Sequence, residues 1–190
     1  MRKFHIITLD STREDLLDIE DYDIRNTDIT KFWSAEKLPP DSASSMKLYI
    51  NEPDSNVIDK TDAVGNPLSL FIFSTRLTIL IYSYIAEDTQ IFDIELNNNS
   101  GINIKDKFKI VHPFKSVDCL DLEQSGLSYS QDEEISVVGN CVIKEKLVPE
   151  DINIFRIKED NNTIIVTDQL AGSLIGKGIN SIAFIRCRSV

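Results

Sequence analysis

The sequence has few of the residues that build the commonest kinds of site. Its 190 residues include only 3 cysteines, 2 histidines, 7 glycines and 6 prolines. The low glycine and proline content excludes collagen-like and low-complexity chains. Cys119, Cys141 and Cys187 form no CxxC pair, and His5 and His112 lie far apart, so the spacing predicts neither a disulfide framework nor a zinc site. We therefore expect reduced cysteines, as in an intracellular protein.

Long hydrophobic runs are also missing. The first 15 residues carry two basic residues near the start, but their apolar run is too short for a signal-peptide core, and acidic residues follow at once. The longest apolar stretch, residues 68–86, is interrupted by Arg76 and by several hydroxyl side chains. This stretch is typical of a protein core and not of a membrane span.

Basic residues are scarce relative to acidic ones. The chain has 20 Lys and Arg against 31 Asp and Glu, which gives a formal charge of −11. A nucleic-acid ligand is disfavoured, because phosphate binding needs a cationic face. The remaining composition, 42% hydrophobic and 27% charged, is that of a globular chain. A chain of this length buries about 70% of the surface that it exposes when unfolded, so no disulfide or metal is needed to hold a core.

The acidic residues are unevenly distributed. Residues 1–66 hold 14 acids and 8 bases, and residues 67–190 hold 17 and 12. We therefore divide the chain into an acidic N-terminal region, 1–66, packed on an α+β domain, 67–190. Within the first part, residues 10–28 carry eight acids and two arginines. Their sparse apolar residues predict, weakly, a short amphipathic helix.

The hydrophobic periodicity predicts a mixture of strands and short helices. Ser74 is positioned to cap a helix running to about residue 86, and Thr167 or Asp168 to cap another over 169–175. Strands are predicted at residues 4–9, 46–50, 68–73, 91–96, 107–111, 152–157, 163–166 and 182–186. The turn residues 159–162 predict that the strands at 152–157 and 163–166 form a hairpin. Because no regular βαβ rhythm is present, we expect an α+β fold with a mixed, mainly antiparallel sheet and a few short helices.

The acidic run around Asp118, Asp121 and Glu123 is the strongest catalytic candidate. Two carboxylates can bind a divalent metal or share acid–base work, which would make the protein a metal-dependent hydrolase. The run lacks a neighbouring histidine or glycine-rich phosphate loop, and it fits equally well a turn held by local hydrogen bonds. Both interpretations stay open at the level of sequence.

Other chemistry has weaker support. The chain contains no GxSxG motif, and the glycine-containing segment 172–178 has the wrong spacing for a phosphate loop and follows a helix. Arg156 lies between apolar neighbours on a predicted strand. Such an arginine either points to solvent or pairs with an internal carboxylate.

The acidic stretch 10–28 has two interpretations. It is either a solvated face that keeps the protein soluble or a docking surface for a basic protein. Complementary charge of this kind speeds encounter and selects partners.

Several runs, taken in order, resemble a known family. They cover roughly residues 68–186 and are FSTRL (73–77), QIFDI (90–94), VDCLDLEQS (117–125), IFRI (154–157), IIVTDQLA (164–171) and a closing segment from Gly178 to Phe184. This succession resembles the bacterial immunity-protein family encoded beside polymorphic toxins, long catalogued as a domain of unknown function.

The resemblance implies a cytoplasmic, non-enzymatic protein that neutralises one cognate toxin by stoichiometric occlusion. It implies no cofactor, no metal, and neither nucleic acid nor membrane as partner. The recurring residues Asp118, Asp121, Ser125 and Arg156 are expected to hold the fold. Positions that contact the toxin would vary with the partner, so we look for them in the acidic first third, which the resemblance does not cover. The candidate toxin contacts there are Asp15, Asp18, Glu20, Asp21 and Asp23. A regulatory or scaffold module that binds an endogenous protein is the alternative of a different class.

Overall fold

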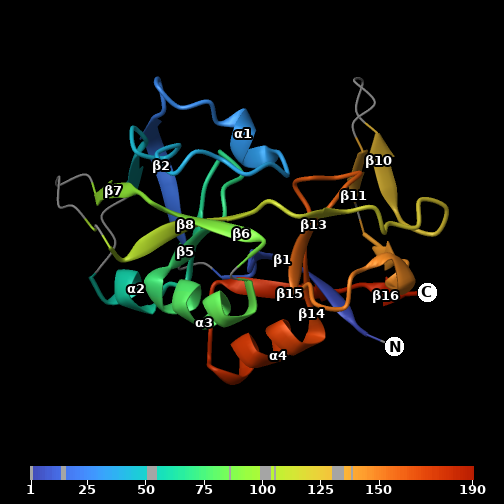
Figure 1. Cartoon of the computed structure of the whole chain (residues 1–190). Helices are drawn as coiled ribbons and strands as arrows, with labels where there is room; N and C mark the ends of the chain where they lie inside the picture. Colours follow the sequence, from blue (N-terminus) through green and yellow to red (C-terminus); the bar gives the residue numbers. More distant parts are fainter. Residues whose placement is uncertain are drawn as a thin grey trace.

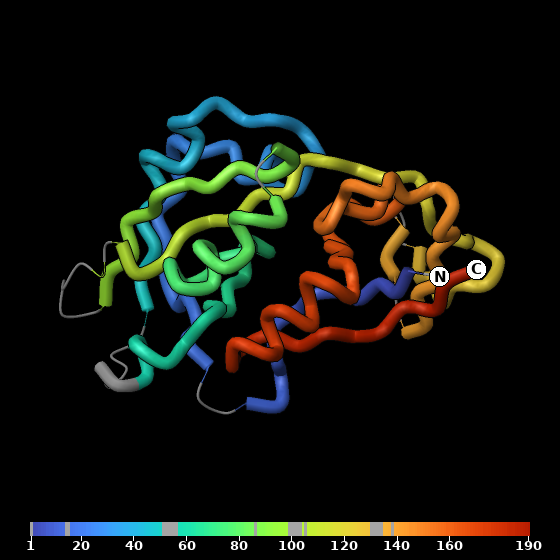
Figure 2. Tube along the Cα trace, turned by 60° about the horizontal axis from the view of Figure 1, so that its bottom comes forward, coloured from blue at the N-terminus to red at the C-terminus, as the bar shows by residue number. Residues whose placement is uncertain are grey.

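The computed structural model describes residues 2–13, 16–50, 55–85, 87–98, 104, 106–129, 135–137 and 139–190. Two sheets of unequal size dominate the fold, and the two chain ends lie side by side at the far end of the smaller one (Figure 1, Figure 2). A hydrogen bond from Ser189 Oγ to the Arg2 carbonyl oxygen, 3.1 Å, joins these ends. Within the described residues, no helix has the length and apolar character needed to cross a bilayer.

The larger sheet has seven strands in the order β6-β8-β5-β4-β2-β3-β7. Their bounds are β2 Leu17–Asp23, β3 Lys47–Ile50, β4 Ala63–Gly65, β5 Ile72–Ser74, β6 Thr89–Asp93, β7 Glu95–Asn98 and β8 Phe108–Pro113. The pairs β2–β4 and β3–β7 are parallel, and the other pairs in this sheet are antiparallel.

The smaller sheet has five strands in the order β15-β1-β14-β13-β9. Their bounds are β1 Phe4–Leu9, β9 Ser116–Val117, β13 Ile154–Ile157, β14 Ile164–Thr167 and β15 Ile182–Arg186. Two small ladders complete the strands: antiparallel β10 Leu127–Tyr129 with β11 Ile135–Val137, and parallel β12 Val142–Ile143 with β16 Arg188–Ser189. The sheets are therefore mixed.

In the described ranges, four short α-helices and one 3₁₀ turn accompany the sheets. They are α1 Thr30–Trp33, α2 Ser55–Lys60, α3 Thr75–Ile85, α4 Asp168–Gly176 and the turn Glu145–Leu147. The Leu77 amide donates to Ser74 Oγ at 3.0 Å and the Leu170 amide to Thr167 Oγ1 at 3.4 Å, so a side chain satisfies one free N–H at each helix start. Helices α3 and α4 lie side by side against the two sheets (Figure 1).

Three hydrophobic cores hold these layers together. Core 1 packs the inner face of β2, β3 and β7, together with one face of β4, β5 and β8, against the segment around α1. Core 2 packs the other face of β4, β5 and β8 against the smaller sheet, α3 and α4. Core 3 covers the remaining face of the smaller sheet. Among the described residues, β2, β3 and β7 thus contribute apolar side chains to a core from one face.

The α+β class, with mixed sheets and short helices, is confirmed. So are the two side-chain-capped helices, the hairpin of β13 and β14, and the terminal strands β1 and β15. The helix predicted within residues 10–28 is wrong, because Leu17 and Ile19 alternate with acids at the spacing of a strand and form β2. The single strand predicted over 91–96 is instead two strands, β6 and β7, which separate at Ile94.

Candidate functional site

Strand β2 carries a row of exposed carboxylates. Leu17 and Ile19 point into core 1, while Asp18, Glu20 and Asp21 are exposed. A strict alternation would bury one of two consecutive residues, but the pairing register with β3 shifts between Ile19 and Asp21. This bulge adds a residue to β2 and leaves two neighbouring acids facing water. We call Asp18, Glu20, Asp21 and Asp23 the acidic face.

Neighbouring strands shape this face. Asp18 pairs with Gly65 of β4, and a Cβ at Gly65 would lie 1.8 Å from Asp18 Oδ1. The missing side chain at residue 65 therefore leaves room for the carboxylate. On the other side, the half-buried Tyr49 lies opposite Asp21, and β7 contributes the exposed Glu95 opposite Lys47. The acidic face is thus bordered by one tyrosine, one lysine and a further glutamate.

The charges on the acidic face are not equally neutralised. Arg25 Nε donates to Asp23 Oδ1 at 2.9 Å, and this hydrogen bond is the main cause that lowers the pKa of Asp23 to about 2. Lys47 lies opposite Asp23 in the ladder. By contrast, none of the described Lys, Arg or His side chains forms an ion pair with Asp18, Glu20 or Asp21. These three carboxylates remain open to a cationic partner.

The acid excess of the whole chain is concentrated in the residues that build the larger sheet. Residues 10–113, which build the larger sheet, hold 19 acids and 10 bases, a net charge of −9. The remaining residues hold 12 acids and 10 bases, a net charge of −2. The field of the protein is therefore most negative around the larger sheet. Asp15, the remaining acidic candidate, lies outside the described residues.

The carboxylates of the 117–125 run form no gathered site. Asp121 accepts hydrogen bonds from the amides of Glu123 and Gln124, both at 3.1 Å, and its own carbonyl oxygen accepts from the Ser125 amide at 2.9 Å. Asp118 instead accepts from Lys158 Nζ at 3.1 Å. Across the described part of the chain, no group of three or more His, Cys, Asp or Glu is arranged to hold a metal ion.

Ser125 ties this turn to the next strand. Its hydroxyl accepts from the Val142 amide at 3.0 Å, and the Asp121 amide donates to the Val142 carbonyl oxygen at 2.8 Å. Asp121 and Ser125 thus belong to one hydrogen-bonded turn next to β12.

Arg156 is buried between the two sheets. Only 3% of the residue is exposed, and burial lowers the pKa of its guanidinium to about 10. Nε donates to the Pro113 carbonyl oxygen at 2.6 Å, Nη2 to the Phe32 carbonyl oxygen at 3.0 Å, and Nη1 to the Asn161 carbonyl oxygen. Among the described residues no carboxylate forms an ion pair with it, so the predicted internal carboxylate partner is wrong. Backbone carbonyls at the ends of β8 and α1 take its place.

His112 completes the contacts of this arginine. Arg156 Nη2 lies 3.4 Å from Nδ1 of His112, and Nε2 lies 2.9 Å from the Glu36 carbonyl oxygen. With the arginine donating to Nδ1, the imidazole is neutral and donates through Nε2. Burial, assisted by the nearby guanidinium charge, lowers the pKa of His112. The sequence showed only a histidine at a predicted strand end, and gave no sign of this contact.

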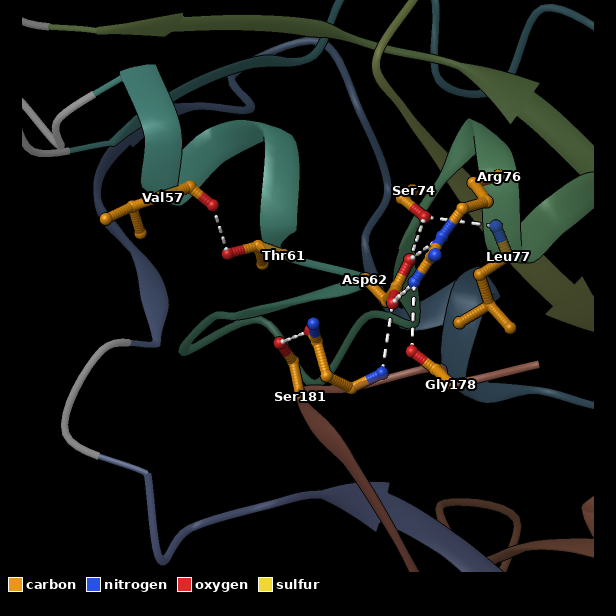
Figure 3. A network of polar contacts seen from close by, with 9 residues as sticks. Val57, Thr61, Asp62, Ser74, Arg76, Leu77, Gly178 and Ser181 are labelled. Atoms are coloured by element: carbon orange, nitrogen blue, oxygen red, sulfur yellow. Dashed lines mark hydrogen bonds and ion pairs between the residues drawn. The ribbon is translucent and has the colours of Figure 1, made fainter. Parts of the chain in front are cut away.

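A second buried charge, Asp62, was not singled out from the sequence. Its carboxylate is 2% exposed and accepts from Ser74 Oγ at 2.8 Å, from Arg76 Nε at 3.1 Å and from the Asn180 amide at 3.0 Å. Arg76 also donates to the Gly178 carbonyl oxygen at 3.3 Å. Figure 3 shows how this network joins the start of α3 to the segment between α4 and β15. Asp62 and Arg156 therefore each connect the larger sheet to the smaller one.

An apolar groove of about 310 Å³ lies between β1 and the segment around β4 and β5. Apolar side chains such as Ile6, Leu9 and Phe71 line it, together with a few hydroxyl and amide groups. None of the described residues that line it has a carboxylate, imidazole or thiol side chain. The groove therefore supplies contact area and no group suited to acid–base catalysis.

Comparison with known proteins gives one family. The model of an immunity protein family (Imm11) matches residues 9–189, nearly the whole chain. The match extends well beyond residues 68–186 toward the N-terminus and includes all of β2. No curated protein matches the chain.

Proposed function

Because the chain belongs to the immunity protein family (Imm11), we propose that it binds one cognate bacterial toxin and neutralises it by stoichiometric occlusion. In this proposal the protein performs no chemistry of its own and acts in the cytoplasm. The turn that contains Asp121 and the separate position of Asp118 support binding over catalysis, since neither carboxylate is placed beside a described third ligand.

The acidic face is the proposed contact surface. The observation that carries this assignment concerns three exposed carboxylates, Asp18, Glu20 and Asp21. They have no ion-pair partner among the described residues, and they lie on a part of the sheet whose described apolar side chains enter a core from the opposite face. A toxin with a basic surface would be steered toward this part of the protein, because most of the acid excess lies in residues 10–113, which build the larger sheet. Tyr49 adds an aromatic side chain of the kind that is enriched at the centres of interfaces.

Asp118, Asp121, Ser125 and Arg156 have a different role in the proposal. Their described bonds go to the turn before β12, to Lys158 and to carbonyl groups between the sheets. We assign them to holding the fold and not to contacting the toxin. Substituting Asp121, Ser125 or Arg156 should therefore lower stability before it lowers affinity, whereas the exposed Asp118 should have the smallest effect of the four.

The test uses the toxin encoded beside the gene for this protein. The two proteins are co-expressed, their complex is isolated, and protection of cells from the toxin is measured. Association and dissociation rates are then measured over a series of salt concentrations for the wild type and for D18K/E20K/D21K. At low salt we expect association to slow by about 10-fold or more and its salt dependence to flatten.

A charge-matched control separates the face from the net charge. The variant E87K/E150K/D151K changes the formal charge by the same amount, at exposed residues outside the acidic face. It should keep most of the wild-type association rate. Equal slowing by both variants would remove the acidic face from the proposal, while a toxin that is neither bound nor neutralised would remove the immunity function itself.

A further inference from the structure

Three buried cysteines gather in core 3, beside the two chain ends. Cys119, Cys141 and Cys187 are at most 3% exposed and belong to the same hydrophobic cluster. The ends of the chain run next to them, where β16 pairs with β12 (Figure 2). The sequence, in which successive cysteines are 22 and 46 positions apart, gave no reason to expect this proximity.

The strand register places two of them opposite each other. In the parallel ladder Val142 pairs with Arg188 and Ile143 with Ser189, so the preceding residues, Cys141 and Cys187, are also cross-strand neighbours. The Arg188 amide donates to the Cys141 carbonyl oxygen at 2.9 Å and fixes this register. Neighbouring strands lie about 4.8 Å apart, within the range of roughly 4.4–6.8 Å between Cα atoms that a disulfide spans.

The two thiols are already in contact. The two thiols are hydrogen-bonded to each other, and the Cys187 sulfur also accepts from the Ile6 amide. These two bonds outweigh burial and lower the pKa of Cys187, while the same contact and burial raise the pKa of Cys141. Cys119 differs, because burial raises its pKa to about 12 without a thiol hydrogen bond. Cys187 also lines a surface hollow of about 310 Å³, so it is the sulfur placed to react first.

We propose that Cys141 and Cys187 are a modification site: a dithiol that closes to a reversible disulfide when the protein meets a hydroperoxide. With hydrogen peroxide, the Cys187 sulfur attacks one oxygen; an S–O bond forms, the O–O bond breaks, and the leaving hydroxide takes up the proton that the Cys187 thiol gives up, which forms water. The Cys141 sulfur then attacks the resulting sulfenic acid. The S–S bond forms, the S–O bond breaks, and a second water leaves with the proton of the Cys141 thiol.

The disulfide would pin the last strand to the body of the protein. It links β12 to the chain immediately before β16 and leaves Cys119 as a free thiol. Because core 3 is far from the acidic face in the fold, this chemistry is independent of the proposed toxin contact. The oxidised protein should unfold at a temperature higher by about 5 °C or more, since the link constrains the unfolded chain.

The test uses the full-length reduced protein and hydrogen peroxide. After exposure to increasing doses in native buffer, the protein is denatured, alkylated, weighed intact and mapped by proteolysis. We expect a species that has lost two alkylatable thiols, a linked peptide pair containing Cys141 and Cys187, an alkylated Cys119, and full reversal by dithiothreitol. Melting curves recorded on the same samples test the stabilisation.

Two variants sharpen the outcome. C119S removes a buried thiol from the same cluster and should leave the linkage intact, whereas C141S should abolish it and leave Cys187 as a sulfenic acid that dimedone traps. The proposal is overturned if wild-type protein keeps all three thiols until it unfolds, or if the linked pair includes Cys119. Peptide mapping of the wild type decides the question even where a variant folds poorly.

Discussion

Charged side chains occupy two contrasting settings in this molecule. On the acidic face, Asp18, Glu20 and Asp21 stand in water without an ion-pair partner among the described residues. Between the sheets, Asp62 and Arg156 are almost completely buried, and each holds several hydrogen bonds. An exposed charge contributes little to stability, whereas a buried one is expensive to leave unpaired. Charged side chains therefore hold the two sheets together at one place and, in the proposed function, meet the toxin at the other.

The largest effect is expected at Arg156, where the contrast is sharpest. Arg156→Lys keeps the charge but cannot reach three carbonyl groups from one planar head. Unfolding in urea should show a loss of about 3 kcal/mol of stability. The control is Lys158→Met, an exposed neighbour whose ion pair with Asp118 should contribute less than about 1 kcal/mol. Equal stabilities for the two variants would contradict the structural role of Arg156.

Asp62 provides the second comparison. In Asp62→Asn an amide group would face Arg76 or the Asn180 amide, so at least one donor loses its acceptor. We expect a loss of about 2 kcal/mol in chemical denaturation. Asp59→Asn is the matched control, because Asp59 is exposed and forms only a surface ion pair with Lys107. That variant should differ from the wild type by about 0.5 kcal/mol or less.

His112 should make the buried region sensitive to acid. Burial lowers its pKa below 6.5 in the folded protein, so below that pH the unfolded chain binds the proton more readily. Stability from this residue is present above pH 6.5 and is lost as the pH falls, at up to about 1.4 kcal/mol per pH unit. Stability measured from pH 7.5 to 5 should fall less steeply in His112→Gln than in the wild type. Parallel curves would show that His112 does not titrate differently on unfolding.

The smallest effect is expected on the acidic face itself. Hydrogen bonds from Arg25 hold the pKa of Asp23 at about 2, below its usual 3.8. The stabilisation by this pair is present above about pH 4 and is lost as the pH falls through about 2. In an NMR titration, Arg25→Ala should return the Asp23 pKa toward 3.8, with little change in stability because the pair is exposed. An unchanged pKa would mean that Arg25 does not hold the carboxylate in solution.

The sequence predicted local features better than distant ones. Caps at Ser74 and Thr167 and the hairpin of β13 and β14 depend on neighbours in the chain, so they were predictable. Strand β2 was predicted as a helix, because only two apolar residues, Leu17 and Ile19, alternate with its many acids. The partners of Arg156 lie as far as 124 residues away in sequence, and no local pattern identifies a backbone carbonyl as the acceptor.

The candidate site was predictable only in part. An excess of acid in residues 10–28 was visible from composition, but its exposure depends on the bulge in β2 and on the missing side chain at Gly65. Both features arise from pairing with strands that are distant in the sequence. The pairing of Cys141 with Cys187 depends in the same way on a ladder between distant segments.

The one-sided burial of β2, β3 and β7 has a consequence for how such a protein can change its partner. Inward residues of these strands build core 1, and outward residues do not, so the two sets can vary separately. A lineage could replace every second side chain here and acquire a new binding preference while keeping its fold. The outward side chains of these three strands could then change the binding specificity while the rest of the fold stays the same.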